Sequence, residues 1–231
     1  IPIYQAHPHL GRIMEPGEWM TEDDLEESSA FESECRSVGN LLPTRRSKTH
    51  VALSTVSRYS GTFFFTVVTY RRQRFLCDED VRLALRESIL RAREQHHFEI
   101  DAWVLLPDHM HCMWTLPEGD ADFSMRWNVI KRGVTRRVGA RLQRSDLMNE
   151  SKAAHRESTL WQRRFWEHQI RADADYQAHM DYIHFNPVKH GLVSHASDWP
   201  HSSFHRHVAS GAYPVDWAGS PDTSLVGGDV E

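Results

Sequence analysis

A regular alternation of strand-like and helix-like segments constrains the fold of this chain most strongly. Residues 62–70 are rich in aromatic and β-branched side chains, as buried strands are. Residues 78–95 then place apolar side chains at helical spacing, with acidic residues in the first turn. Two strand-like stretches, 98–106 and 109–116, meet at a tight Pro107-Asp108 turn. A second helix over 123–142 and a fourth strand over 160–171 complete the series.

This order of elements predicts an α+β fold. The succession strand–helix–strand–strand–helix–strand is that of the ferredoxin-like βαββαβ unit, whose strands form an antiparallel sheet. A third helix is expected over residues 173–185. It should end before Pro187, because the residue that precedes a proline disfavours the helical conformation.

The two ends of the chain differ from its middle. Residues 1–57 show little periodicity, and residues 209–231 contain repeated glycine and proline. We therefore expect a poorly ordered N-terminal extension over 1–57, a folded domain over 58–208 and a C-terminal tail over 209–231. The net charge of −5 comes from these ends, since residues 51–212 carry 22 basic and 19 acidic side chains.

Composition excludes several classes of protein. Hydrophobic residues make up 40% and charged residues 26% of the chain, as in ordinary globular proteins. The apolar runs are far shorter than the ~20 residues that a membrane helix needs. Three cysteines without a CxxC pair argue against a disulfide framework or a zinc ribbon. We expect a soluble, cytoplasmic protein that has no membrane partner.

The first chemical signal is the pair His109 and His111. Residues two apart on a strand point to the same face, so both imidazoles can reach one metal ion, while Met110 points into a core. The alternative interpretation is a half-buried strand with two incidental histidines.

The second signal is the segment Tyr182 to Val193. Tyr182 and Asn186 are four residues apart and share one helix face. A tyrosine hydroxyl beside a metal ligand can act as a nucleophile, although its ordinary pKa of ~10 means that it needs activation. The alternative is a plain helix end, with Pro187 as terminator and Gly191 shaping the exit.

The third signal is positive charge. Residues 123–145 contain no acid, and their seven basic side chains suit a phosphate backbone better than a solvated helix face, which normally mixes signs. The aromatic and cationic stretch 161–166 could stack on unpaired bases, although Trp166 could equally be a core residue. The candidate DNA-binding residues are Arg126, Lys131, Arg132, Arg136, Arg137, Arg163, Arg164 and Lys189.

Together these motifs resemble one family over about residues 58–207. The run Trp103 to His111 is similar to the His–hydrophobic–His (HUH) motif of single-tyrosine transposases, and Tyr182 to Val193 resembles the tyrosine helix of their REP-associated branch. The stretches 61–69, 126–131, 165–168 and 198–204 are also similar to that family. Residues 1–57 are not covered by the resemblance.

The resemblance implies a mechanism. His109, His111 and Asn186 would bind Mg²⁺ or Mn²⁺, and Tyr182 would attack a phosphate of single-stranded, hairpin-forming DNA to leave a 5′-phosphotyrosine. Two imidazoles are unusual for Mg²⁺, so Co²⁺ and Zn²⁺ remain alternatives. His168 and His179 could approach the ion or have a structural role. The competing hypotheses are a hairpin-binding module that does not cut DNA and an unrelated metal-dependent phosphodiesterase.

Overall fold

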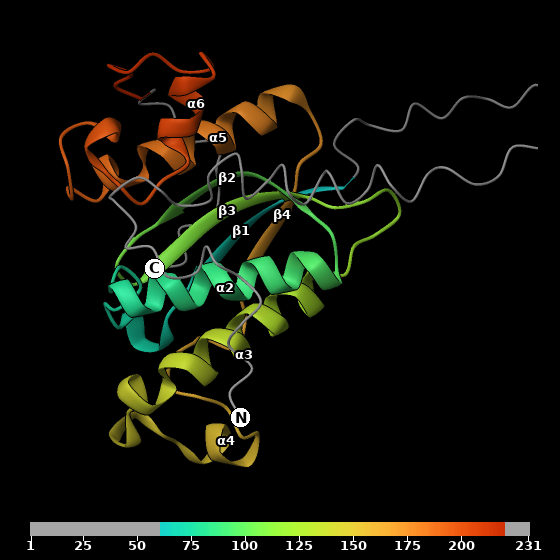
Figure 1. Cartoon of the computed structure of the whole chain (residues 1–231), viewed down its shortest axis with the longest axis vertical. Coiled ribbons are helices and arrows are strands. Elements are labelled where there is room, and N and C mark those ends of the chain that lie inside the picture. The colour runs from blue at the N-terminus through green and yellow to red at the C-terminus, as the bar shows by residue number, and fades with distance from the viewer. Residues whose placement is uncertain (1–60, 220–231) are drawn as a thin grey trace, which may run out of the picture.

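A computed structural model describes residues 61–219. The chain is α+β, as predicted. Four strands form one antiparallel sheet in the order β2-β3-β1-β4 (Figure 1). The strands are β1 (Thr62–Val68), β2 (Glu99–Leu105), β3 (His109–Thr115) and β4 (Trp166–Gln169). The helices are α2 (Glu79–Gln95), α3 (Phe123–Leu142), α4 (Glu150–Ala154), α5 (Asp173–Lys189) and α6 (Phe204–Ala209). The predicted N-terminal extension, 1–57, lies outside the described residues.

Helices cover both faces of the sheet. Figure 1 shows α2 and α3 on one face and α5 and α6 on the other. Side chains alternate along β1, so this strand packs against both helical layers. Phe63 and Phe65 belong to the core beneath α2 and α3, whereas Phe64 belongs to the core beneath α5. The side chain of each β1 residue thus points into one of the two cores. The α5 layer is the one that carries the candidate chemistry.

The fourth strand is shorter than predicted. Only Trp166–Gln169 pair with β1, although strand character was expected throughout 160–171. The pair Thr66–Trp166 is followed by the isolated bridge Thr69–Trp161, so the four residues 162–165 on one side oppose the two residues 67–68 on the other. Two extra residues therefore loop out, and the ladder is interrupted as at a β-bulge.

The helix that carries Tyr182 is longer than predicted. It continues through Pro187 to Lys189, so the expected stop at residue 185 was wrong. Proline removes only one backbone donor, and the final turn is closed around it by hydrogen bonds from His190 N to Asn186 O (3.0 Å) and from Leu192 N to Pro187 O (2.9 Å). Pro187 is also buried, so the packing around it offsets its helix-breaking tendency.

Part of the predicted C-terminal tail is packed. Tyr213 is only 7% exposed and belongs, with Trp217 at its edge, to the core that α5 and α6 share. The ring of Tyr213 lies 5.0 Å from that of His184 on α5. The segment 209–217 therefore belongs to the folded body, and residues 220–231 lie outside the described part.

Candidate active site

Strand β3 places both histidines of the HUH motif on the face beneath α5. His109 and His111 are 5% and 3% exposed, and their ring centroids are 5.0 Å apart. Met110 lies between them in sequence and packs into the opposite core, beneath α2 and α3. The strand alternation predicted from the sequence is confirmed, and the two imidazoles share one face.

Neighbouring oxygens orient the two rings. The Nδ1 atom of His109 lies 2.8 Å from Asp108 Oδ1, and Nδ1 of His111 lies 2.9 Å from Thr66 Oγ1 on β1. Both contacts use Nδ1, so the Nε2 atom of each ring is not engaged by them. A ligand histidine is commonly held in this way, through the ring nitrogen that does not touch the metal.

Asp108 and Thr66 were missed as site residues by the sequence analysis. Asp108 was interpreted there only as part of a turn, although a carboxylate next to an HxH pair was a usable signal. Thr66 had no local signal, because only the register of β1 against β3, in which Thr66 pairs with His111, brings it to the site.

Helix α5 brings the predicted nucleophile against these histidines. The ring centroid of Tyr182 lies 5.1 Å from that of His111, and the ring of His190 lies 5.2 Å from that of His109. Asn186 is four residues from each and therefore lies on the same helix face, between them. The structure thus brings His109, His111 and Tyr182 together, and the helix spacing puts the buried Asn186 on the face that carries Tyr182.

Several buried polar atoms at the site lack a hydrogen-bond partner within residues 61–219. They are Nε2 of His111 and both side-chain amide atoms of Asn186, a residue that is fully buried. Over 90% of buried polar groups in folded proteins are satisfied, so such atoms need an explanation. Two imidazole nitrogens and one amide oxygen form a donor set that fits a divalent cation, which would satisfy them.

Electrostatics at the site favour a neutral His111 ring and an ionised Asp108 carboxylate. Burial lowers the pKa of His111 well below its usual value, and the nearby His109 acts in the same direction. Burial alone would raise the pKa of Asp108, but the hydrogen bond from His109 and the Arg72 guanidinium outweigh it and hold that pKa at about 2. A neutral imidazole such as that of His111 is the form that binds a metal ion, and an ionised carboxylate such as that of Asp108 can orient a ligand histidine.

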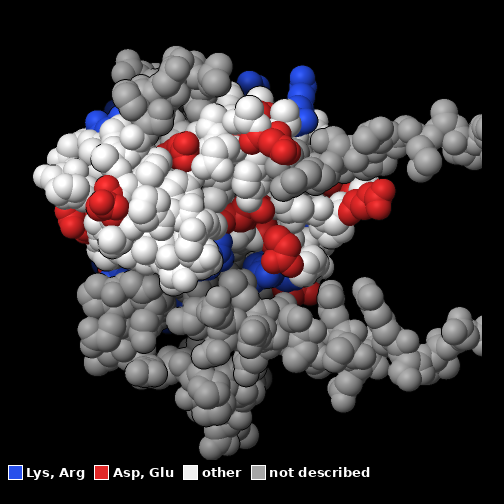
Figure 2. All heavy atoms as spheres, turned by 90° about the horizontal axis from the view of Figure 1, so that it is seen from above, with Lys and Arg blue, Asp and Glu red and all other residues white. Residues whose placement is uncertain are grey.

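The predicted DNA-binding residues do not form one surface. Lys189 lies at the site, with its Nζ atom 5.1 Å from the ring centroid of Tyr182. Helix α3 covers the opposite face of the sheet, so its basic residues lie on the far side of the molecule from Tyr182. Figure 2, which looks onto the α5 and α6 layer, shows Lys and Arg mainly at the edges of that surface.

One of these residues is buried and a second is half-buried. Arg126 is 2% exposed; its guanidinium forms an ion pair with Asp120 (2.7 Å) and donates to the carbonyl oxygens of His96 and His97. Lys131 donates to Gln162 O at 3.2 Å and faces an aromatic ring at 5.3 Å. Both side chains stabilise the packing around α3.

Although residues 123–145 contain no acid, two of the α3 cations are paired with acids from α2 and the residue before it. Arg137 pairs with Glu87 at 3.0 Å, and Arg141 pairs with two aspartates that precede or begin α2. These acids lie outside the segment 123–145, so the sequence of α3 alone could not reveal them. Arg163 forms an ion pair with Glu157 within its own loop. Arg132, Arg136 and Arg164 are exposed.

The sequence pattern of the family described as "Transposase IS200 like" matches residues 57–186, more than half of the chain. The chain belongs to this transposase family. The transposase is 49% identical over 159 residues to the REP-associated tyrosine transposase of Escherichia coli K12, covering 69% of this chain and 86% of that one. It is 41% identical over 167 residues to a putative REP-associated tyrosine transposase of Haemophilus influenzae Rd, covering 72% and 93% of the two chains.

A solved structure is also similar to this transposase. It is described as a REP-associated tyrosine transposase bound to a REP hairpin. The two share 45% sequence identity with a TM-score of 0.58, and the match covers 78% of this chain and 93% of that one. No helix within residues 61–219 is long and apolar enough to cross a lipid bilayer.

Proposed function

We propose that this transposase cleaves and rejoins single-stranded, hairpin-forming DNA with Tyr182 as its nucleophile. The observation that carries the proposal is the contact of the Tyr182 ring with His111, beside the unsatisfied polar atoms of His111 and Asn186. A module that only binds DNA has no need of a buried tyrosine against two metal-type imidazoles. Hairpin DNA is the substrate expected from the 45% identical relative that is described as bound to a REP hairpin.

The same site would hold one divalent ion, Mg²⁺ or Mn²⁺, through His109, His111 and Asn186. When bound, the ion polarises the scissile phosphate and neutralises the charge that develops on it. Asp108 and Thr66 keep the two rings in place, so the chain contributes a preformed set of ligands.

The reaction exchanges one phosphate ester for another. The Tyr182 Oη atom attacks phosphorus and loses its proton to solvent, and the bond from phosphorus to the 3′ oxygen breaks. The leaving oxygen takes up a proton and becomes a 3′-hydroxyl, while the 5′ end stays attached as a phosphotyrosine. Because an ester bond is formed for each one broken, attack by a 3′-hydroxyl can reverse the step and join strands.

Lys189 is the predicted DNA-binding residue that lies closest to this chemistry. Its Nζ atom lies beside the Tyr182 ring at the last turn of α5. An ammonium group there can contact a phosphate adjacent to the scissile one. Arg132, Arg136 and Arg137 line a separate groove between α2 and α3 and would contact a more distant part of the DNA.

The test is formation of a covalent protein–DNA adduct. The full chain is incubated with a single-stranded hairpin oligonucleotide and Mn²⁺ or Mg²⁺, then analysed on a denaturing gel. We expect a shifted protein band that EDTA removes and that Tyr182→Phe abolishes while hairpin binding persists. Tyr70→Phe is the matched control, since Tyr70 lies outside the site and its hydroxyl accepts a hydrogen bond from Asn149.

Hairpin binding without any adduct would instead support the non-cleaving module. Metal-dependent cleavage that leaves no adduct and survives Tyr182→Phe would support the unrelated phosphodiesterase.

A further inference from the structure

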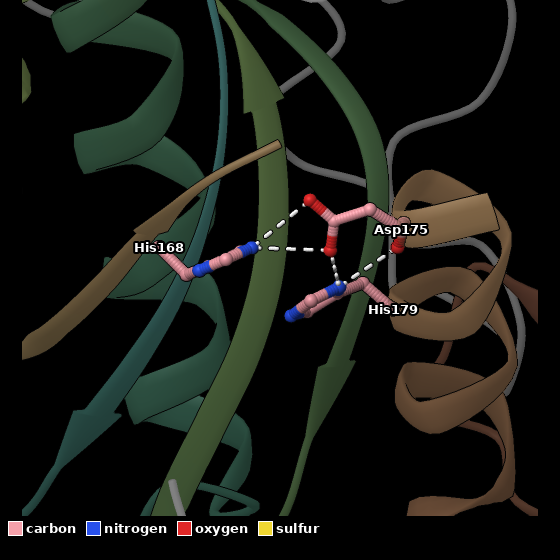
Figure 3. Close-up of side chains that lie close together, drawn as sticks. All are labelled: His168, Asp175 and His179. Carbon is pink, nitrogen blue, oxygen red and sulfur yellow. Dashed lines mark hydrogen bonds and ion pairs between the residues drawn. The ribbon is translucent and has the colours of Figure 1, made fainter. Parts of the chain in front are cut away.

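A second group of metal-type side chains lies on the same face of the sheet, at the start of α5. His168 comes from the edge strand β4, and Asp175 and His179 come from the first two turns of α5 (Figure 3). Nε2 of His168 lies 3.0 Å and 3.1 Å from the two carboxylate oxygens of Asp175, and Nδ1 of His179 lies 3.0 Å from one of them. The donor atoms of all three residues lie within 4.8 Å of one another.

This group is distinct from the HUH site. The ring of Phe64 contacts a member of each group, with its centroid 4.7 Å from that of His179 and 5.6 Å from that of His111. None of its three members belongs to the set His109, His111 and Asn186. An ion held here would therefore not be the one that contacts the scissile phosphate.

The group contains more acceptor atoms than hydrogens to share among them. Nδ1 of His179 faces two acceptors at once, the Asp175 carboxylate and the Asp175 carbonyl oxygen at 2.8 Å. A neutral imidazole has one N–H, so it can donate fully to only one of them. His168 likewise presents one ring nitrogen to two oxygens. A bound cation satisfies converging lone pairs of this kind without any further hydrogen.

We propose that His168, Asp175 and His179 form a second metal site, which binds Zn²⁺ or a similar divalent transition metal. Two imidazoles and one carboxylate suit such ions better than they suit Mg²⁺. The His168 and His179 rings are nearly parallel, 11° apart with centroids separated by 4.8 Å, so one of them turns when an ion binds in the plane of both. His168 has the freedom to turn, since its side chain is 35% exposed on an edge strand.

The bound ion would join β4 to the first turns of α5. Asp175 already accepts a hydrogen bond from Arg171 N at 3.0 Å and so holds the start of the helix. Tyr182 lies seven residues further along the same helix face. The second site is therefore expected to hold the helix that carries the nucleophile against the sheet.

Zn²⁺ binding to the full chain, stripped of metal with EDTA, tests the proposal. Isothermal titration calorimetry measures stoichiometry, and Co²⁺ absorption reports ligand geometry. We expect the His168→Ala protein to bind one Zn²⁺ ion fewer, or to bind that ion with an affinity at least tenfold lower. The same loss should occur in a His109→Ala/His111→Ala background, where the HUH site is absent. His155→Ala is the matched control, because His155 is exposed and lies at the end of α4.

Unchanged Zn²⁺ stoichiometry and affinity in a folded His168→Ala protein would overturn the proposal, as would an equal loss in His155→Ala. Asp175→Asn provides a second variant that keeps the shape of the side chain and removes its charge. Formation of the Tyr182–DNA adduct is measured in a separate assay. Loss of the second metal site can therefore be told apart from failure of the proposed DNA cleavage.

Discussion

At the scale of single residues, the proposed chemistry uses polar atoms that the fold buries and leaves unsatisfied. Asn186 is fully buried, and both of its amide atoms lack a hydrogen-bond partner within the described chain. An unsatisfied buried polar group costs about 1–3 kcal/mol, which is a large share of the stability of a domain. Binding of a metal ion by the Asn186 side chain, as proposed above, would offset this cost.

Asn186→Ala should therefore separate stability from activity. Loss of an unsatisfied amide offsets the small cavity that alanine leaves, so the free energy of unfolding should stay within about 1 kcal/mol of the original. Metal-dependent adduct formation should fall at least about tenfold, because the variant lacks one ligand. Urea unfolding and the gel assay measure the two effects. A large loss of stability with unchanged Mn²⁺ dependence would give Asn186 a structural role instead.

Asp108→Asn tests how His109 is oriented. The carboxylate, whose pKa is held at about 2, stays ionised throughout the neutral range and accepts from Nδ1 of His109. An amide can present its NH₂ group to that nitrogen and favour the wrong tautomer, so the Mn²⁺ concentration for half-maximal adduct formation should rise about 10–100-fold. Asp146→Asn is the control, since Asp146 is exposed and pairs with Arg144. Equal Mn²⁺ dependence in both variants would contradict this role of Asp108.

Residues on one strand or one helix face were predictable, whereas partners across the fold were not. His109 and His111 follow from a period of two, and Tyr182 and Asn186 follow from a spacing of four. The role of Arg126 did not follow from α3 alone, because its carbonyl partners lie about 30 residues earlier.

At the scale of elements, the sequence predicted the four strands and the helices α2, α3 and α5, missed the short helices α4 and α6, and was less accurate about where elements end. The α3 boundaries were predicted to the residue. The limits of β4 and α5 were not, because the first depends on pairing with a distant strand and the second on packing that outweighs one proline. Neither effect can be predicted from the local propensities of the residues at these boundaries.

The contact between α2 and α3 depends on Gly133. A Cβ atom at this position would overlap the Oγ atom of Ser88 on α2, so the two helices approach as closely as they do because the side chain is absent. Glycine to alanine normally stabilises an exposed helix by roughly 1 kcal/mol. Here we expect the opposite sign, a destabilisation of about 1–3 kcal/mol from overpacking.

A double-mutant cycle checks this expectation. Ser88→Gly removes both atoms that the new Cβ would strike, so Gly133→Ala should cost much less in that background. Equal effects of Gly133→Ala with and without Ser88→Gly would show that the close contact does not limit packing.

At the scale of the whole molecule, the sheet separates two charged regions. The HUH histidines, Tyr182 and Lys189 lie beneath or on α5, whereas an arginine-lined groove of about 720 Å³ lies between α2 and α3 on the other side. Arg91, Arg132 and Arg136 line this groove, and its single acidic residue, Glu87, pairs with Arg137. A DNA that engages both regions must pass around an edge of the sheet.

The double variant Arg132→Ala/Arg136→Ala tests whether DNA reaches that far. Removing each phosphate-binding side chain should reduce the slope of log K against log salt by about 0.9 for duplex DNA, so hairpin binding should weaken and become less salt-dependent. The rate of adduct formation at saturating DNA should stay unchanged, because neither residue touches the tyrosine face. Arg144→Ala is the control, as that side chain is exposed and paired with Asp146. An unchanged salt slope would place the hairpin entirely on the α5 side of the sheet.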